Sequence, residues 1–157
     1  MLHVNDPAPD FTVFNQRREP VSLSSFRDKA TVVLYFYPRD DTPGCTIEAN
    51  QFTELAYEFA ALGAHVIGVS RDDCASHQAF IDKYGLQVEL LADTDGELCR
   101  AYDVWQEKEK NGVKTMGIVR STFIIDRSGN LIDVMYGVSP EGHAREVLDH
   151  LQQLDGG

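Results

Sequence analysis

Apolar residues occur along the chain in two patterns, and their alternation predicts strands separated by helices. Residues 30–37 form a run rich in β-branched and aromatic side chains, which is typical of a strand buried on both faces of a parallel sheet. Apolar residues at helical spacing follow and predict a helix over residues 43–62, which Gly63 ends as a left-handed cap. Residues 64–70 complete a β-α-β unit.

The alternation continues after this unit. A second helix, capped by Asp72 or Asp73 and ended by Gly85, is predicted to place His77 on its apolar face. Residues 88–92 then predict a third parallel strand.

Smaller elements are predicted toward both ends of the chain. Two extended pieces and one helical turn precede the first long strand, at residues 11–14, 21–23 and 24–28. A short helix is expected to begin at Asp93 or Thr94, and residues 103–119 are expected to contain a charged surface loop at residues 107–112. A hairpin signal then joins two strands, at residues 121–126 and 131–136.

The last predicted element is a helix with Ser139 as its cap and Pro140 at its first position. Its buried stripe is predicted to contain Ala144, Val147, Leu148, Leu151 and Leu154. This order of elements is typical of a thioredoxin-like α/β sandwich with a central mixed sheet and helices on both faces. We expect one domain over residues 1–157.

Composition narrows the classes of partner and compartment. A chain of 157 residues with 43% hydrophobic content can bury an ordinary core. The net charge of −11 argues against nucleic-acid and anionic-membrane partners, which need a basic patch. The apolar runs are far shorter than a membrane span, and the first residues lack the pattern of a secretory signal. Three widely spaced cysteines do not form a disulfide framework, so we expect a cytoplasmic protein.

Cys45 is the residue with the clearest chemistry. Thr42 is predicted to cap the helix and Pro43 to occupy its first position, which places Cys45 in the first turn. Unpaired N–H groups and the helix dipole favour a thiolate there. Because nucleophilicity falls as a thiol's pKa falls, ionisation alone gives only a few-fold advantage. Fast chemistry at Cys45 would therefore need groups that hold the substrate.

Several sequence blocks resemble one enzyme family. Pro38, Thr42 and Cys45 match the Pro-x-x-x-Thr-x-x-Cys signature of peroxiredoxins, and residues 42–49 are similar to the bacterioferritin-comigratory (Q-type) subfamily. Further matches are Asp10-Phe11, residues 68–70, residues 91–93, residues 120–126 and Gly129. The resemblance covers nearly the whole chain. It implies a thioredoxin fold, no metal or other cofactor, and reduction of hydrogen peroxide and organic hydroperoxides by a Cys45 thiolate that becomes a sulfenic acid.

The resemblance also implies roles for the neighbours of Cys45. The Thr42 hydroxyl would bond the thiolate and the incoming peroxide, and Pro38 would shield them. Arg120 would lower the thiolate pKa and stabilise charge on the departing oxygen, since the strand that it precedes is implied to run antiparallel to residues 32–37. Glu48 would orient Arg120. Backbone N–H groups near Gly44 would hold the peroxide oxygens.

Each of these residues also has an ordinary structural interpretation. Cys45 could be a small buried hydrophobe, Thr42 an N-cap and Pro38 the end of a strand. Arg120 could be a solvated surface residue, and Glu48 a favourable carboxylate near a helix N-terminus.

The fate of the sulfenic acid is open. Positions where many subfamily members carry a resolving cysteine hold Asn50 and Ile81 here. Cys99 lies on a predicted apolar face, so Cys74 is the remaining candidate. We expect a one-cysteine mechanism with an external thiol as reductant. A two-cysteine mechanism with a Cys45–Cys74 disulfide is the alternative.

Other function classes fit less well. A thiol–disulfide oxidoreductase needs a Cys-x-x-Cys pair, which the chain lacks. A redox sensor or chaperone-like protein based on Cys45 needs a reactive thiol, but it does not need Thr42 and Arg120 to hold a peroxide. The histidines are not spaced along the sequence as metal ligands usually are; they are His3, His65, His77, His143 and His150. The resemblance suggests thioredoxin, glutaredoxin or a small thiol as reductant, and a monomer or weak dimer.

Overall fold

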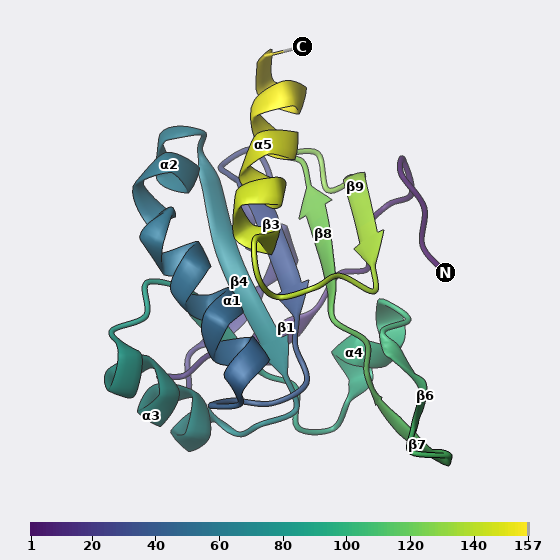
Figure 1. The fold of residues 1–157 in the computed structure, drawn as a ribbon. Helices are drawn as coiled ribbons and strands as arrows, with labels where there is room; N and C mark the ends of the chain where they lie inside the picture. The colour runs from purple at the N-terminus through teal and green to yellow at the C-terminus, as the bar shows by residue number, and fades with distance from the viewer. Residues whose placement is uncertain (157) are drawn as a thin grey trace.

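The computed structural model describes residues 1–156, and its centre is a five-stranded mixed sheet (Figure 1). The strands lie in the order β5-β4-β3-β8-β9, with the bounds Glu89–Ala92, Ala64–Ser70, Thr31–Phe36, Ser121–Ile125 and Leu131–Tyr136. β3 is parallel to β4 and antiparallel to β8, with Phe36 opposite Ser121. The sheet confirms the predicted thioredoxin-like arrangement and brings the start of β8 beside the end of β3.

Four helices of the described chain pack on one face of this sheet, and α1, α2 and α5 cross in front of it in Figure 1. Their bounds are Pro43–Glu54 (α1), Ala56–Ala61 (α2), Cys74–Tyr84 (α3) and His143–Gly156 (α5). Asp73 caps α3 by accepting the N–H of Ser76, and Gly85 ends it with a φ of 64°, as predicted. The apolar core on this face includes Val33, Tyr35, Phe52, Phe59, Phe80, Ile124, Val147 and Leu148.

The other face of the sheet is covered by shorter elements. These are β1 (Thr12–Phe14), β2 (Pro20–Ser22), the 3₁₀ turn η1 (Leu23–Phe26) and α4 (Glu97–Ala101). Their core includes Phe11, Leu34, Phe36, Ile67, Leu98, Cys99, Tyr102 and Phe123. Burial of a large apolar side chain contributes about 1.5–3 kcal/mol, so both faces fix the position of β3.

The helix predicted over residues 43–62 is divided at Leu55. This residue leaves helical geometry with a φ of −99° and a ψ of 12°, and its N–H donates to the carbonyl oxygen of Gln51 at 3.3 Å. The bend lets Phe52 and Phe59 both pack fully buried, with their ring centroids 5.7 Å apart. The apolar spacing stays in phase across the bend, so periodicity alone does not reveal it.

The charged surface loop expected at residues 107–112 is wrong, because these residues belong to a β-hairpin. β6 (Trp105–Lys110) pairs with β7 (Val113–Ile118) in antiparallel register. Asn111 and Gly112 form the two-residue turn, with φ values of 55° and 78°. Asn-Gly is a strong signal for this turn, since both central residues need positive φ. The dense charge on β6 concealed its strand pattern.

The start predicted for the last helix is also wrong. α5 begins at His143 rather than at Pro140, and Ser139 therefore does not cap it. Gly142 has a φ of 80°, which is incompatible with helical backbone extending back to Pro140. Leu154 is 46% exposed because the last turns of α5 run beyond the sheet (Figure 1).

The short helix α4 starts later than expected, at Glu97 rather than at Asp93 or Thr94. Gly96 precedes it with a φ of 76°. The Asp93 carboxylate nevertheless serves the helix, since it accepts the N–H groups of Leu98 and Cys99.

Candidate active site

Cys45 is the third residue of α1, as the sequence predicts, and its side chain is buried. Pro43 occupies the first position of the helix, and the first intrahelical bond runs from the N–H of Thr46 to the carbonyl oxygen of Thr42. The N–H groups of Gly44 and Cys45 therefore have no acceptor within the helix. They and the helix dipole favour an anion at this position, which suits a thiolate.

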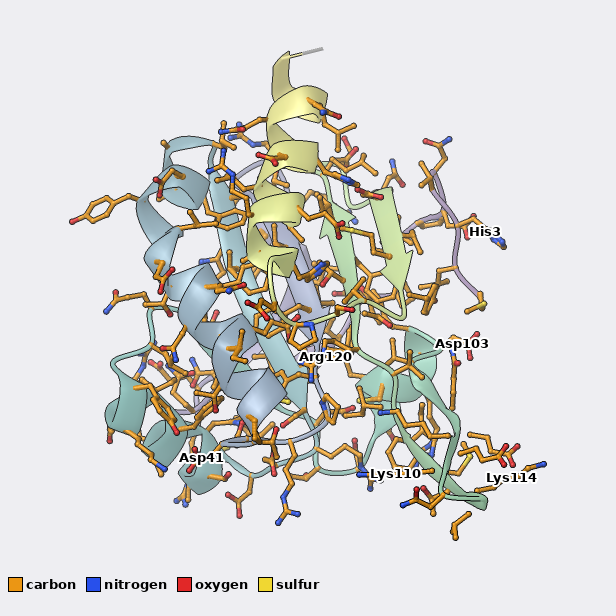
Figure 2. All side chains as sticks on the ribbon, viewed as in Figure 1. His3, Asp41, Asp103, Lys110, Lys114 and Arg120 are labelled. Atoms are coloured by element: carbon orange, nitrogen blue, oxygen red, sulfur yellow. The ribbon has the colours of Figure 1, made fainter. Side chains whose placement is uncertain are left out.

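Arg120 joins Cys45 to Glu48 through the two ends of its guanidinium. Nη2 donates to Cys45 Sγ at 3.4 Å, and Nη1 donates to Glu48 Oε1 at 2.7 Å. Arg120 comes directly before β8, and the pairing of Ser121 with Phe36 places it next to the end of β3. In Figure 2 it lies beside the N-terminal part of α1. The structure thus brings together the three residues that the sequence singled out, two from α1 and one from the start of β8.

Burial and mutual charge shift the pKa values of Glu48 and Arg120. Glu48 is fully buried, which raises its pKa to about 7 although Arg120 acts in the opposite direction. Burial alone would lower the pKa of Arg120, but Glu48 and Cys45 outweigh it and hold that pKa above its ordinary value. The side chain of Arg120 is 14% exposed, so one edge of the guanidinium remains open to a ligand.

Thr42 occupies the N-cap position, but its hydroxyl does not cap the helix. Oγ1 donates to the carbonyl oxygen of Arg39 at 2.9 Å, which corrects the expected side-chain cap. With its one proton directed to Arg39, the hydroxyl has lone pairs left to accept a hydrogen bond. Because this bond to Arg39 uses the only proton of the hydroxyl, Thr42 can bind a substrate only by accepting a hydrogen bond from it.

Pro38 follows β3 and is exposed at the rim of a shallow groove. The groove is also lined by Arg71, Trp105, Lys108 and Met116. The Arg71 guanidinium stacks over the Trp105 ring at 4.6 Å. One wall of this groove is the β6–β7 hairpin, which therefore lies opposite Pro38.

Lys108 is a cation of the site that the sequence interpretation missed. Burial and the neighbouring charge of Arg120 lower its pKa, whereas Cys45 raises it. Lys108 forms no ion pair within residues 1–156. The Asn111-Gly112 turn was the signal that could have placed Lys108 on a strand rather than in a loop.

Gly44 is packed between two parts of the site. A Cβ at this position would lie 3.2 Å from Nη2 of Arg120 and 3.3 Å from Cγ of Pro140. The absence of a side chain therefore lets Arg120 approach Cys45. Pro140 is a second neighbour that the sequence did not indicate, because it was expected inside a helix.

The other two cysteines have different surroundings, and all three are free thiols. Cys99 is fully buried, and burial with the nearby Asp93 raises its pKa far above the ordinary value, so it remains a neutral core thiol. Cys74 is the first residue of α3 and is half-buried. Neither position expected for a resolving cysteine holds one: α1 has Asn50 there, and α3 has Ile81.

One group of possible metal ligands occurs near the site. Asp40, Asp72 and His77 place ligand atoms within 4.8 Å of one another, which the spacing of the histidines did not predict. Both nitrogens of His77 already have hydrogen-bond partners, and so does each carboxylate. The group is therefore a satisfied polar network.

Comparisons with known proteins agree with this geometry. The AhpC/TSA family matches residues 4–134. The putative peroxiredoxin bcp of Helicobacter pylori is 44% identical over 150 residues, which are 96% of this chain and 98% of the relative. Peroxiredoxin Bcp of Bacillus subtilis is 41% identical over 153 residues, which are 98% of this chain and 97% of the relative.

Solved structures give the same picture. The bacterioferritin comigratory protein of Xanthomonas campestris, studied for its alkyl peroxide reduction activity, matches with a TM-score of 0.90 at 36% identity. The match covers 98% of each chain. A peroxiredoxin Q mutant from Xylella fastidiosa matches with a TM-score of 0.92 at 35% identity.

Proposed function

The chain belongs to the AhpC/TSA family, as a peroxiredoxin of the bacterioferritin-comigratory (Q) type, and we propose that Cys45 is its peroxidatic residue. It is a thiol-dependent peroxidase, which takes a hydroperoxide as oxidant and a thiol as reductant. The observation that carries the assignment of Cys45 is the contact of 3.4 Å between its Sγ and Nη2 of Arg120.

The reaction begins with attack of the Cys45 thiolate on the terminal oxygen of the hydroperoxide. An S–O bond forms as the O–O bond breaks, and the electron pair of the O–O bond leaves on the second oxygen. Cys45 becomes a sulfenic acid, and the departing hydroxide or alkoxide takes up a proton to leave as water or an alcohol.

The neighbours of Cys45 hold the two oxygens. The Thr42 hydroxyl accepts the O–H of the peroxide, because its own proton is directed to Arg39. Arg120 stabilises the thiolate before attack and the negative charge on the departing oxygen during it. Glu48 positions Arg120, the N–H groups of Gly44 and Cys45 face the developing charge, and Pro38 shields the rim of the site.

We propose that an external thiol reduces the sulfenic acid. The first thiol condenses with it to a mixed disulfide and releases water, and a second thiol then frees Cys45 and leaves as part of a disulfide. The two-cysteine route is the alternative: Cys74 is half-buried at the start of α3, and a disulfide with Cys45 would need the two Cα atoms within roughly 4.4–6.8 Å.

The finer partners are part of the same proposal. We propose hydrogen peroxide and organic hydroperoxides as substrates, and thioredoxin, glutaredoxin or a small thiol as reductant. We further propose an antioxidant role in cytoplasmic redox homeostasis, carried out by a single-domain monomer or weak dimer over residues 1–157. Within residues 1–156, no helix has the length and apolar character needed to span a bilayer.

The test is the intact mass of the reduced protein after one equivalent of hydrogen peroxide, with and without a sulfenic-acid trap. We expect a gain of one oxygen, capture of the trap at Cys45 and no reaction in Cys45→Ser. A loss of two hydrogens that Cys74→Ser abolishes would establish the two-cysteine route. Oxidation without multiple turnover, when thiols are supplied, would favour the redox sensor. No change in mass would remove Cys45 from the mechanism.

A further inference from the structure

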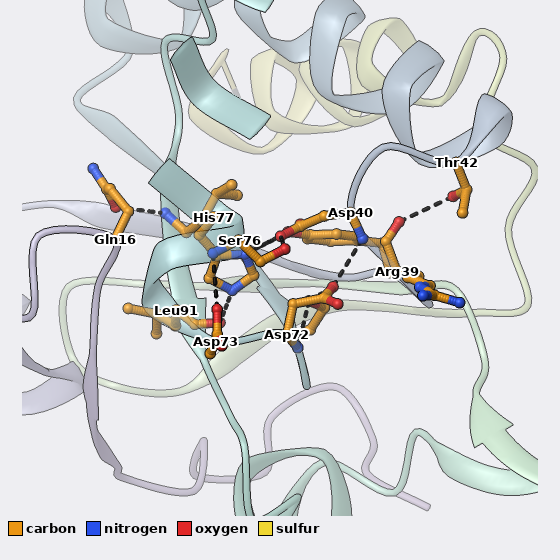
Figure 3. A network of polar contacts seen from close by, with 12 residues as sticks. Gln16, Arg39, Asp40, Thr42, Asp72, Asp73, Ser76, His77 and Leu91 are labelled. Atoms are coloured by element: carbon orange, nitrogen blue, oxygen red, sulfur yellow. Dashed lines mark hydrogen bonds and ion pairs between the residues drawn. The ribbon is translucent and has the colours of Figure 1, made fainter. Parts of the chain in front are cut away.

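A buried network ties the segment before α1 to the first turns of α3 (Figure 3). The Asp40 carboxylate accepts three hydrogen bonds, from the hydroxyl of Tyr37, from Oγ of Ser76 at 2.8 Å and from Nδ1 of His77 at 2.7 Å. The side chains of Asp40 and His77 are 4% and 0% exposed. The proposed chemistry uses neither of them.

Hydrogen-bond partners fix the protons of this network. Nε2 of His77 lies 2.8 Å from the carbonyl oxygen of Leu91, which can only accept, so Nε2 carries a proton. Nδ1 faces an oxygen of Asp40, so one further proton lies between the two groups. Asp40 and His77 are therefore joined by a single proton, which lies between Nδ1 and the carboxyl oxygen.

The same loop is tied to its surroundings at two further points. The backbone N–H of Asp40 donates to Oδ2 of Asp72 at 2.8 Å. Asp41, whose φ is 56°, accepts hydrogen bonds from Nζ of Lys83 and the hydroxyl of Tyr84 at the surface of α3. Residues 38–42 are thus held on α3 from the core and from the surface.

This attachment to α3 determines the position of the groups before α1 that are proposed to hold the peroxide, here called the peroxide cradle. Residues 38–42 carry Pro38 and Thr42, and the Thr42 hydroxyl is held by the carbonyl of Arg39, the residue directly before Asp40. A shift of Asp40 would therefore move both the Thr42 hydroxyl and its partner. Cys45 is held within α1, and Arg120 is held by its bond to Glu48 and by its place directly before β8; the Thr42 side chain has no such bond to either element.

We propose that Asp40 and His77 are positioning residues for peroxide reduction, which act by fixing the Thr42 hydroxyl relative to the Cys45 thiolate. The inference rests on the proposed function of Cys45 and Thr42. It predicts that breaking the pair slows attack on peroxide while the thiolate itself stays reactive toward reagents that do not use the cradle.

The experiment compares two rates for the full chain: oxidation of Cys45 by hydrogen peroxide and its alkylation by iodoacetamide. For Asp40→Ala we expect the peroxide rate to fall roughly ten- to hundredfold, because small displacements of positioning groups have effects of this size. The alkylation rate should change less than about threefold, because alkylation needs only the thiolate. Asp40→Asn should recover most of the peroxide rate, since its amide can donate to Nδ1 of a neutral His77.

Two further variants keep the test decisive. Ser76→Ala removes one half-buried donor to Asp40 and should lower the peroxide rate a few-fold even if Asp40→Ala does not fold. Asp133→Ala is the matched control, because Asp133 forms a similar pair of 2.6 Å with His150, which α5 carries. Its peroxide rate should equal that of the wild type.

Two results would overturn the proposal. The first is a wild-type rate of oxidation by peroxide in Ser76→Ala, and also in Asp40→Ala if that variant folds. The other is an equal fall in the peroxide and alkylation rates, which would mean that the network supports the thiolate or the fold. Failure of the proposed function has a different signature, since wild-type Cys45 would then be alkylated but not oxidised.

Discussion

The guanidinium of Arg120 donates to Oε1 of Glu48 at 2.7 Å, and Glu48 is completely enclosed by protein. The second oxygen of Glu48, Oε2, has no hydrogen-bond partner in the described chain. One carboxylate oxygen is therefore used to hold Arg120, and the other contributes only an energetic cost of burial. Such an arrangement is expected where an exact position of the cation matters more than stability.

Replacement of Arg120 tests that position. Arg120→Ala should lower the rate of Cys45 oxidation by hydrogen peroxide roughly 10²–10³-fold, because it removes a charged donor to the departing oxygen. Arg120→Lys should fall between this variant and the wild type, since an ammonium keeps the charge but cannot bind Glu48 and Cys45 in one plane. Stopped-flow or quenched mass measurements give both rates. Equal oxidation rates for Arg120→Lys and the wild type would exclude a role for the planar geometry of the guanidinium.

Glu48 should make the stability of the fold depend on pH. Its pKa is raised by burial from the ordinary 4.5 to about 7, so the native state keeps this proton after the unfolded chain has lost it. The contribution of Glu48 to the free energy of unfolding is therefore fully present below about pH 4.5 and falls as the pH rises to about 7.

Glu48→Gln removes this titration. The free energy of unfolding of the variant, relative to the wild type, should rise by up to about 3 kcal/mol between pH 4.5 and 7. The attraction of Arg120 for the ionised carboxylate is already contained in this pKa, so the remaining effects of the substitution add only an offset that does not depend on pH. Urea unfolding at several pH values measures the difference, and parallel curves for the two proteins would contradict the assignment.

Gly44→Ala separates stability from activity. The position is helical, so alanine should leave the free energy of unfolding unchanged or raise it by up to about 1 kcal/mol. The new Cβ would nevertheless lie 3.2 Å from Nη2 of Arg120, and the guanidinium would have to move. We expect a peroxide rate lower by roughly tenfold, which corresponds to about 1.4 kcal/mol of activation free energy.

A companion variant supplies the control for Gly44. Pro140→Ala relieves the second close contact, of 3.3 Å, and leaves that with Arg120. Gly44→Ala should therefore stay slow when combined with Pro140→Ala. Recovery in the double variant would show that Pro140, rather than Arg120, is displaced.

The sequence was sufficient for the parts of the site that depend on local pattern. The buried run before Pro38 and the helix after Thr42 placed Cys45 at a helix start, whereas Arg120 was placed beside it through the antiparallel pairing that the family resemblance implied. The direction of the Thr42 hydroxyl was not predictable, since a cap and a bond to Arg39 are both local options for threonine.

The residues that were missed reach the site through tertiary packing. Lys108 lies on β6, a charged strand without an apolar period, and Pro140 lies in a turn that resembled a helix start. His77 was expected on a buried face, but its pairing with Asp40 joins residues 37 positions apart, which no local pattern encodes. Two misses were errors in the local signals, the Asn-Gly turn and the start of the last helix, whereas the pairing of His77 with Asp40 depends on tertiary contact.

Lys108 should act on Cys45 through its charge alone. Lys108→Gln removes a half-buried cation near the thiolate, so alkylation of Cys45 by iodoacetamide at neutral pH should slow by about two- to fivefold, the effect of a partly screened charge. The difference should shrink in high salt, because screening already weakens the wild-type interaction. Lys114→Gln is the matched control, since Lys114 lies on the same hairpin and points away from the body of the protein (Figure 2). An equal effect of both substitutions would show that net charge, rather than the position of Lys108, sets the reactivity of Cys45.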